Sequence, residues 1–261
     1  MHIRSLGLST ELQLAATRSQ LTDRGDYIVV VTPEEPGYFF GNLLVLPAAP
    51  QVGEVAYWIR RFTDEMRGEP AVRHVAFRWD GITGELGARD ELVAAGFTLE
   101  VHAVMTAPQV TAGSIAFDVR PLRPDELHAT GELAYAIGDQ HDERYRHFLQ
   151  RRATWGRQLV TRGIAQFWGA FDGAQLVASL GLVPLGRVAR YQDVQTAASH
   201  RKQGIAGALL AAAAAAVRDA GVETFVIVAE PDSDAARVYA RAGFTTVERT
   251  ASAWRQPFAG S

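Results

Sequence analysis

The stretch Arg201-Lys202-Gln203-Gly204-Ile205-Ala206-Gly207 gives the clearest indication of a chemistry in this chain. It lies between a β-rich run, Val188 to Thr196, and an alanine-rich helix that is expected to begin near Gly204. Small residues let backbone amides approach a ligand closely, and the unpaired N–H groups of a first helical turn, together with the helix dipole, favour an anion. The stretch therefore predicts a phosphate or pyrophosphate site at a strand-to-helix turn.

Composition places the chain among ordinary globular proteins. Of its 261 residues, 48% are hydrophobic and 21% are charged, as is usual for a globular protein. The length is sufficient for one large domain or two small ones. A net charge of −3 gives no overall basic field for nucleic acid, so any attraction for phosphate has to be local. The chain has no cysteine, which excludes disulfides, a thiol nucleophile and a thiolate metal site, and we expect no metal. The expected partner is a small molecule.

The ends and apolar runs of the chain bear on its location. The amino terminus, Met1 to Ser5, lacks the apolar core of a secretory signal, and no apolar stretch is both long enough and free of charge to span a bilayer. We therefore expect a cytoplasmic protein with neither a membrane nor a nucleic acid as partner. The sequence leaves the oligomeric state open, a homodimer included.

The order of predicted elements repeats along the chain. The first half is predicted to contain a helix at 9–21 capped by Ser9 or Thr10, strands at 27–31 and 39–46, a helix at 52–66, a strand at 72–79, a helix at 88–95 and a strand at 97–106. After a linker-like segment, 107–113, the second half is predicted to contain a strand at 116–121, helices at 124–137 and 142–161, strands at 165–171, 176–183 and 188–196, a helix at 204–220, a strand at 224–229, a helix at 234–242 and a final strand at 244–250 that closes the sheet. This order predicts an α/β (α+β) fold with two domains, 1–110 and 111–261, each a mixed sheet flanked by helices.

A short repeated segment supports the interpretation that the chain has two related halves. Ala95-Gly96-Phe97-Thr98 is identical to Ala242-Gly243-Phe244-Thr245, and each copy ends an amphipathic helix and opens a strand. The two copies occupy the same place in two similar orders of elements. We therefore interpret the chain as a duplicated fold.

Two signatures in the second half, roughly Ile115 to Gln256, resemble those of the GCN5-related N-acetyltransferase (GNAT) superfamily. The first, Arg/Gln-x-x-Gly-x-Gly/Ala, is met by Arg201 to Ala206. The second, Asn-x-x-Ala-x-x-x-Tyr-x-x-x-Gly-Phe, is met with Asp in place of Asn by Asp232, Ala235, Tyr239, Gly243 and Phe244. The two occur in the order and at the spacing that the family shows. The resemblance implies a tandem GNAT fold whose second half carries the cofactor.

The resemblance also implies how acetyl-CoA is held. Its pyrophosphate is expected on the signature turn, and its pantetheine arm is expected to pair with the backbone of Val194 and Thr196 between two splayed strands. The cofactor-binding residues implied in this way are Val194, Gln195, Thr196, Arg201, Lys202, Gln203, Gly204, Ile205, Ala206, Gly207, Asp232 and Tyr239. An alternative is that Gly204 and Gly207 only allow close packing of the helix. Because Asp232 departs from the usual Asn, we expect a weaker cofactor contact there and a capping role at the helix near Asp234.

The catalytic groups follow from the same resemblance. A tyrosine at the position of Tyr239 often serves as general acid for the departing thiolate, and its alternative is a packed, half-buried aromatic. Asp193 is the only carboxylate in the run before the signature and is the candidate base; strand alternation puts it on one face with Gln195. A solvent relay through Tyr191, or Glu230, remains open as the base. The run His141-Asp142-Glu143 either lines the acceptor site or caps a helix.

The first half lacks these groups. Leu92 stands where Tyr239 stands, and Pro47-Ala48-Ala49-Pro50-Gln51 replaces the signature turn, with prolines that remove backbone donors. Its domain is therefore interpreted as a degenerate copy without a cofactor.

The leading hypothesis is an N-acetyltransferase that moves an acetyl group from acetyl-CoA to a primary amine of a small molecule or peptide by direct attack. One alternative is a non-catalytic acyl-CoA-binding sensor or interaction module, and another is transfer to oxygen or of a longer acyl chain. Other motifs are absent: the chain has no Gly-x-Gly-x-x-Gly at the turn, no Gly-x-x-x-x-Gly-Lys-Ser/Thr, no nucleophile elbow and no His-Glu-x-x-His. Dinucleotide-binding, hydrolase and metalloprotease functions are therefore not expected.

Overall fold

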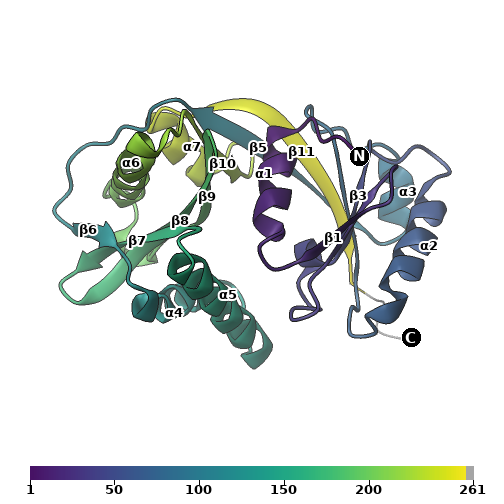
Figure 1. Ribbon diagram of the computed structural model, residues 1–261, viewed down its shortest axis with the longest axis horizontal. Coiled ribbons are helices and arrows are strands. Elements are labelled where there is room, and N and C mark those ends of the chain that lie inside the picture. Colours follow the sequence, from purple (N-terminus) through teal and green to yellow (C-terminus); the bar gives the residue numbers. More distant parts are fainter. Residues whose placement is uncertain (257–261) are drawn as a thin grey trace. The chain divides into compact units, whose positions relative to one another are not determined.

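The computed structural model describes residues 1–256, and neither of its two units is continuous in sequence (Figure 1). Of the described residues, unit 1 comprises Met1–Val104, Ala229–Pro231 and 246–256, and unit 2 comprises Met105–Val228 and Asp232–Thr245. Each unit combines helices with β-strands, so the predicted mixed α/β fold is confirmed. The division falls somewhat before the predicted boundary at residue 110, and the last strand counts almost wholly with unit 1.

Unit 1 is a mixed sheet with helices on both faces. It contains α1 (Leu6–Ala15), β1 (Gln20–Asp23), β2 (Ile28–Val31), η1 (Phe39–Gly41), β3 (Leu43–Leu46), α2 (Val55–Glu65), η2 (Met66–Gly68), β4 (Val75–Trp79), α3 (Arg89–Ala94), most of β5 (Thr98–Ala107) and most of β11 (Thr245–Arg255). Strands β1, β2 and β3 pair antiparallel in turn, β3 pairs parallel with β4, and β4 pairs antiparallel with β11.

Burial along β3 explains why its sequence is apolar at every position. Leu44 and Leu46 join a core cluster with Trp58 and Phe62 of α2 and Leu92 of α3. The two residues that alternate with them, Leu43 and Val45, join a second cluster with Leu8 and Leu12 of α1. Since successive strand residues point to opposite faces, a strand covered on both sides has to be apolar throughout.

The start of α1 differs from the sequence prediction. The helix begins at Leu6 and not at Ser9, because Ser5 is its cap and the Ser5 hydroxyl accepts the N–H of Leu8 at 3.2 Å. Two distant carboxylates also accept amides at this end: Asp80 from Ser5 at 2.9 Å and Glu248 from Leu6 at 2.9 Å. The helix also ends at Ala15, so the predicted extension to Leu21 was wrong and strand β1 was missed.

Unit 2 is an antiparallel meander extended by one parallel strand. It contains β6 (Asp118–Pro121), η3 (Pro124–Glu126), α4 (His128–Ile137), α5 (Glu143–Thr161), β7 (Gln166–Asp172), β8 (Gln175–Leu185), β9 (Val188–Thr196), η4 (Ala198–His200), α6 (Ile205–Val217), η5 (Arg218–Ala220), β10 (Thr224–Ala229) and α7 (Asp234–Arg241). Strands β6 to β9 pair antiparallel in turn, and β9 pairs parallel with β10. The predicted helices and strands of this half are confirmed to within a few residues.

The last strand is longer than predicted and has a different neighbour. β11 runs to Arg255, beyond the predicted end at Thr250, and its residues Ser252 to Arg255 pair with β4. Its apolar positions Ala251 and Ala253 are buried in the unit 1 core. The expectation that this strand closes the sheet of the second half was therefore wrong for its final residues.

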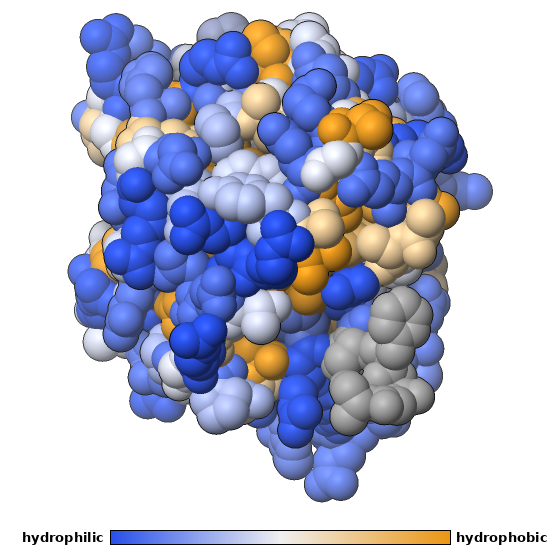
Figure 2. Space-filling view, turned by 90° about the vertical axis from the view of Figure 1, so that its right-hand side faces the viewer, coloured by the Kyte–Doolittle hydropathy of each residue, from blue (hydrophilic) through white to orange (hydrophobic). Residues whose placement is uncertain are grey.

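Among the described residues, five large apolar side chains are exposed, namely Val52, Tyr57, Ile82, Val93 and Val247. Figure 2 shows a face on which hydrophilic residues predominate and hydrophobic ones form small separate patches. None of the helices described for residues 1–256 combines the length and the low charge that crossing a bilayer requires.

Candidate functional site

A β-bulge interrupts β9 beside the signature turn. Ser179 of β8 pairs with Gln195, but Gly181 pairs with Gln192, so β9 holds one residue more than β8 over this interval. Asp193 has a φ of 50°, a left-handed conformation that a non-glycine residue adopts rarely. Because of the extra residue, Asp193, Val194 and Gln195 all line one cavity. The strict alternation predicted for this run is interrupted, because Gln192 and Gln195 pair with Gly181 and Ser179, which lie on one face of β8.

Strands β9 and β10 separate at the level of this bulge. The parallel pairing described between them covers Val188 to Arg190 against Thr224 to Val226, and β9 continues to Thr196 beyond the last of these pairs. Unpaired N–H and C=O groups on a strand edge can pair with an extended amide chain. The open edge of β9 therefore has the character expected for holding a pantetheine arm.

The turn from β9 into α6 offers backbone donors. Gly204 is the cap residue of α6, with a φ of 78°, and no side chain caps the first turn. The amides of Ile205, Ala206 and Gly207 belong to this turn, whose N–H groups have no intrahelical acceptors, and the helix dipole adds positive potential there. Arg201 and Lys202 precede the turn and are exposed. The turn therefore matches the needs of a diphosphate.

The glycines of the turn are not explained by tight packing. A Cβ added at Gly207 would meet only the Cβ of Ala112 at 3.6 Å, and one added at Gly204 would meet only Ile115 Cγ2 at 3.4 Å. Both distances are ordinary van der Waals contacts. Gly204 is required by its left-handed backbone, whereas Gly207 leaves space above the first turn.

The start of α7 lies within the electrostatic reach of the turn. Hydrogen bonding to Arg237 lowers the pKa of Asp234, and Lys202 and Arg201 lower it further. Asp232 is exposed and has a φ of 60°. The helix is capped by Ser233, whose hydroxyl accepts the amide of Ala236 at 3.1 Å, so the predicted capping role of Asp232 was wrong.

Tyr239 is buried in α7, with 6% of its surface exposed. Its ring meets Phe244 edge to face at 6.3 Å between ring centroids. Burial raises the pKa of its phenol to about 12, so the hydroxyl keeps its proton at neutral pH. A tyrosine of ordinary pKa also keeps its proton at neutral pH, so the raised pKa does not by itself favour the predicted acid role.

The alternative bases differ in their surroundings. Tyr191 donates its hydroxyl to the carbonyl of Leu210 at 2.7 Å, and burial raises its pKa. Because the hydroxyl of Tyr191 already donates to a buried helix carbonyl, a proton relay through this phenol is not favoured. Glu230 counts with unit 1, and Asp193 belongs to the bulge.

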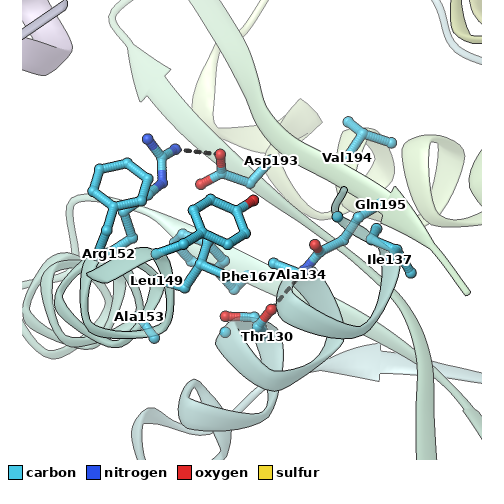
Figure 3. A pocket seen from close by; sticks show the side chains of 14 residues that line it. Thr130, Ala134, Ile137, Leu149, Arg152, Ala153, Phe167, Asp193, Val194 and Gln195 are labelled. Carbon is cyan, nitrogen blue, oxygen red and sulfur yellow. Dashed lines mark hydrogen bonds and ion pairs between the residues drawn. The ribbon is translucent and has the colours of Figure 1, made fainter. Parts of the chain in front are cut away.

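A cavity of about 430 Å³ opens beside the bulge, between α4, α5 and β9 (Figure 3). The carboxylate of Asp193 forms an ion pair with the guanidinium of Arg152. The side-chain amide of Gln195 donates to the carbonyl of Thr130 at 3.0 Å and to the hydroxyl of Ser179 at 2.8 Å. The cavity is thus shaped on one side by the predicted β9 residues and on the other by two helices.

Sequence reasoning did not single out the α5 side of this cavity. Tyr145, Phe148, Leu149 and Arg152 line it, and their spacing of three and four residues marks one face of a helix. In the run His141-Asp142-Glu143, Asp142 caps α5 by accepting the amide of Tyr145 at 2.8 Å. None of these three residues lines the cavity, so the run has the capping role.

Comparison with known proteins agrees with this geometry. Residues 133–254 match the family model described as the acetyltransferase (GNAT) domain. The resemblance of the second half of the chain to the GNAT superfamily is therefore confirmed. No curated protein matches the chain.

Solved structures resemble the chain over most of its length. A conserved protein of unknown function from Staphylococcus epidermidis is 13% identical, with a TM-score of 0.72 over 91% of this chain and 93% of its own. A GCN5-related N-acetyltransferase from Kribbella flavida is 17% identical, with a TM-score of 0.65 over 95% of this chain and 93% of its own. A tandem GNAT protein from the clavulanic acid biosynthesis pathway is 12% identical, with a TM-score of 0.56 over 82% of this chain and 75% of its own. At these identities the likeness is one of fold.

Proposed function

We propose that the chain is an acetyl-CoA-dependent N-acetyltransferase whose single active site lies in unit 2. The observation that carries the proposal is the open edge of β9, which leads directly into the uncapped, glycine-containing first turn of α6. The GNAT domain match supports acyl transfer in general. We further propose a primary amine of a small molecule or peptide as acceptor, a cytoplasmic location and a tandem arrangement with a degenerate unit 1.

The described residues fit acetyl-CoA. The first-turn amides of α6, with Arg201 and Lys202, would hold the diphosphate, and the backbone of Val194 and Thr196 would pair with the amides of the arm. Acetyl-CoA supplies a thioester whose carbon–sulfur bond is exchanged for a carbon–nitrogen bond to the amine, while the sulfur leaves with the electron pair and takes up a proton. The remaining chemistry falls to the protein.

Two groups of unit 2 supply that chemistry in the proposal. Tyr239 holds a proton on its hydroxyl at neutral pH and is the donor for the leaving sulfur. Asp193 is the carboxylate at the bulge and is the acceptor for the proton that the amine gives up. Its ion pair with Arg152 has to open for this step.

The pairing of Asp193 with Arg152 also favours a second function. A carboxylate engaged by a guanidinium is not poised as a base, and this suits a non-catalytic acyl-CoA-binding sensor. The two functions differ in one measurement, which is release of free thiol from acetyl-CoA in the presence of amines. An enzyme releases thiol in step with acetylated product, whereas a sensor binds the cofactor and releases none.

Calorimetric titration with acetyl-CoA tests the cofactor. The variant Gly207→Glu places a carboxylate over the first turn of α6 at a position with space for a side chain and ordinary backbone geometry. The control Ala215→Glu adds the same charge at an exposed position of the same helix. We expect binding by the wild type and the control, and at least about a tenfold loss in Gly207→Glu because like charges repel. Equal binding by both variants, or none by folded wild type, would contradict the proposal.

A further inference from the structure

The cavity beside the bulge has a specific charge pattern. Its lining residues include two charged side chains, Arg152 from α5 and Asp193 from β9, and these two form an ion pair with each other (Figure 3). Both are partly exposed, at 22% and 37% of their side-chain surfaces, so both can be reached from the cavity. The cavity therefore presents one positive and one negative group side by side.

The rest of the cavity is largely apolar. Phe148, Leu149 and Phe167 lie among its walls, with Ala134 and Ile137 from α4. The guanidinium of Arg152 lies 5.7 Å from the centre of the Phe148 ring, a cation–π contact that helps to fix its position. A volume of about 430 Å³ is sufficient for a small organic molecule. An apolar side chain would be well accommodated there.

Charge compensation selects the kind of molecule that can enter. A simple ammonium ion would pair with Asp193 but would separate Arg152 from its anionic partner. A simple carboxylate would pair with Arg152 but would leave Asp193 without its cation. A ligand that carries both charges can replace both halves of this ion pair at once, so it is favoured over a ligand that carries only one.

We propose that the acceptor of the acetyl group is an α-amino acid with a large apolar side chain, and that Arg152 determines this specificity by binding the acceptor carboxylate. The amino group then lies at Asp193, on the bulged strand that also carries the proposed acyl-CoA contacts. In the reaction the ammonium group first gives one proton to Asp193, which passes it to solvent. The neutral amino nitrogen then forms a bond to the acetyl carbon, the carbon–sulfur bond breaks, and the second proton lost by nitrogen is balanced by the proton gained by sulfur. This inference rests on the proposed acetyltransferase function and specifies its substrate class.

Matched pairs of acceptors test the inference with the full chain. L-Phenylalanine, L-leucine and L-tryptophan are each compared with the amine that lacks the carboxylate, namely phenethylamine, isopentylamine and tryptamine, by measuring thiol release and the acetylated product. We expect kcat/KM to be at least about tenfold higher for the amino acid of each pair, the size of a charge-assisted hydrogen bond. 3-Phenylpropanoate, which has the carboxylate but no amine, leaves Asp193 without a cation and is therefore expected to inhibit only weakly against L-phenylalanine.

Arg152→Gln should reduce the ratio of kcat/KM for L-phenylalanine over phenethylamine by about tenfold or more, and Arg152→Lys should restore part of it. The control Arg157→Gln removes a charge from an exposed position of the same helix and should leave the ratio as in the wild type. Equal activity on both members of each pair, a ratio that Arg152→Gln does not change, or acetylation of neither member by protein that binds acetyl-CoA would overturn the inference. Failure to bind acetyl-CoA would instead overturn the proposed function itself.

Discussion

The junction from β9 to α6 in unit 2 and the junction from β3 to α2 in unit 1 hold the same place in their orders of elements, yet only the first is open. In unit 1 the parallel pairing of β3 with β4 reaches Leu46 opposite Trp79, and the amide of Asp80 then donates to the carbonyl of Leu46 at 3.0 Å. In unit 2 the pairing of β9 with β10 stops at Arg190. A parallel pair that stays hydrogen-bonded to its end leaves no strand edge for a ligand.

The helix starts differ in the same way. Before α2, the carboxylate of Glu91 accepts the amide of Gly53 at 2.7 Å, and the carbonyl of Pro50 accepts the amide of Ala88 at 2.7 Å. Neither α2 nor α6 has a side-chain cap on its first turn, so the difference lies in the residues just before each helix. A helix start without a cap is therefore more open to an anion where no carboxylate of the chain binds an amide just before it.

The two glycine corners show the difference in a single residue. Gly96 and Gly243 both have a positive φ, and in each corner the next residue, a phenylalanine, donates its amide to the carbonyl five residues before it. That carbonyl belongs to Leu92 in unit 1 and to Tyr239 in unit 2. The two corners therefore have the same backbone hydrogen bond, but only the corner in unit 2 carries a side-chain hydroxyl, that of Tyr239.

The largest expected effect comes from removing that hydroxyl. Tyr239→Phe keeps the packing against Phe244 but removes the proton donor, and kcat should fall by about 100-fold while the affinity for acetyl-CoA changes by less than about twofold. The control Tyr191→Phe removes a different buried hydroxyl, which donates to Leu210, and should lower stability by about 1 kcal/mol with turnover retained. Stopped assays for turnover and thermal unfolding for stability separate the two. Full turnover in Tyr239→Phe would remove the acid role.

The pH dependence of turnover sharpens the same comparison. Because burial raises the pKa of Tyr239 to about 12, the acid form is the populated one at every lower pH. kcat should therefore show no loss between about pH 7 and about pH 10.5 that is attributable to this phenol, whose ordinary pKa is about 10. An alkaline fall centred near pH 10 in the wild type, and absent from Tyr239→Phe, would show that the phenol ionises more easily than its burial implies.

A smaller effect, on stability, is expected from removing the carboxylate that binds an amide just before α2. Glu91→Gln removes the charge that the amide of Gly53 faces, and stability should fall by about 0.5 kcal/mol. Asp90→Asn is the matched control, because Asp90 is exposed and pairs with its neighbour Arg89. Since β3 and β4 stay paired, no second acetyl-CoA should bind. A second site appearing in the Glu91→Gln titration would mean that the carboxylate alone closes unit 1.

Local patterns in the sequence were sufficient to predict most elements and the signature turn, but contacts between distant residues were not predictable. The cap of α1 depends on Asp80 and Glu248, which are far from Ser5 in sequence. β1 carries no alternation, since most of its side chains are exposed. The final pairing of β11 with β4 could not be predicted, because the apolar pattern of a strand does not show which strand lies beside it.

At the candidate site, too, local features could be predicted from the sequence and contacts between distant residues could not. The turn at Gly204 was recognised because glycine is required by its backbone, a local property. The bulge was not foreseen, because its left-handed residue is an aspartate and not a glycine. Arg152 was not singled out as a lining residue because its partner Asp193 is on another element, and one sequence does not show which residues meet.

Amide hydrogen–deuterium exchange with and without saturating acetyl-CoA tests the central claim most directly, because it reports on both junctions in one experiment. We predict slower exchange in peptides that cover Val194 to Gly207 and unchanged exchange in peptides that cover Pro47 to Val55. Slower exchange only in the peptides that cover Pro47 to Val55 would contradict the assignment of the acyl-CoA site to unit 2. Unchanged exchange in both sets of peptides, under conditions where acetyl-CoA binds, would contradict it as well.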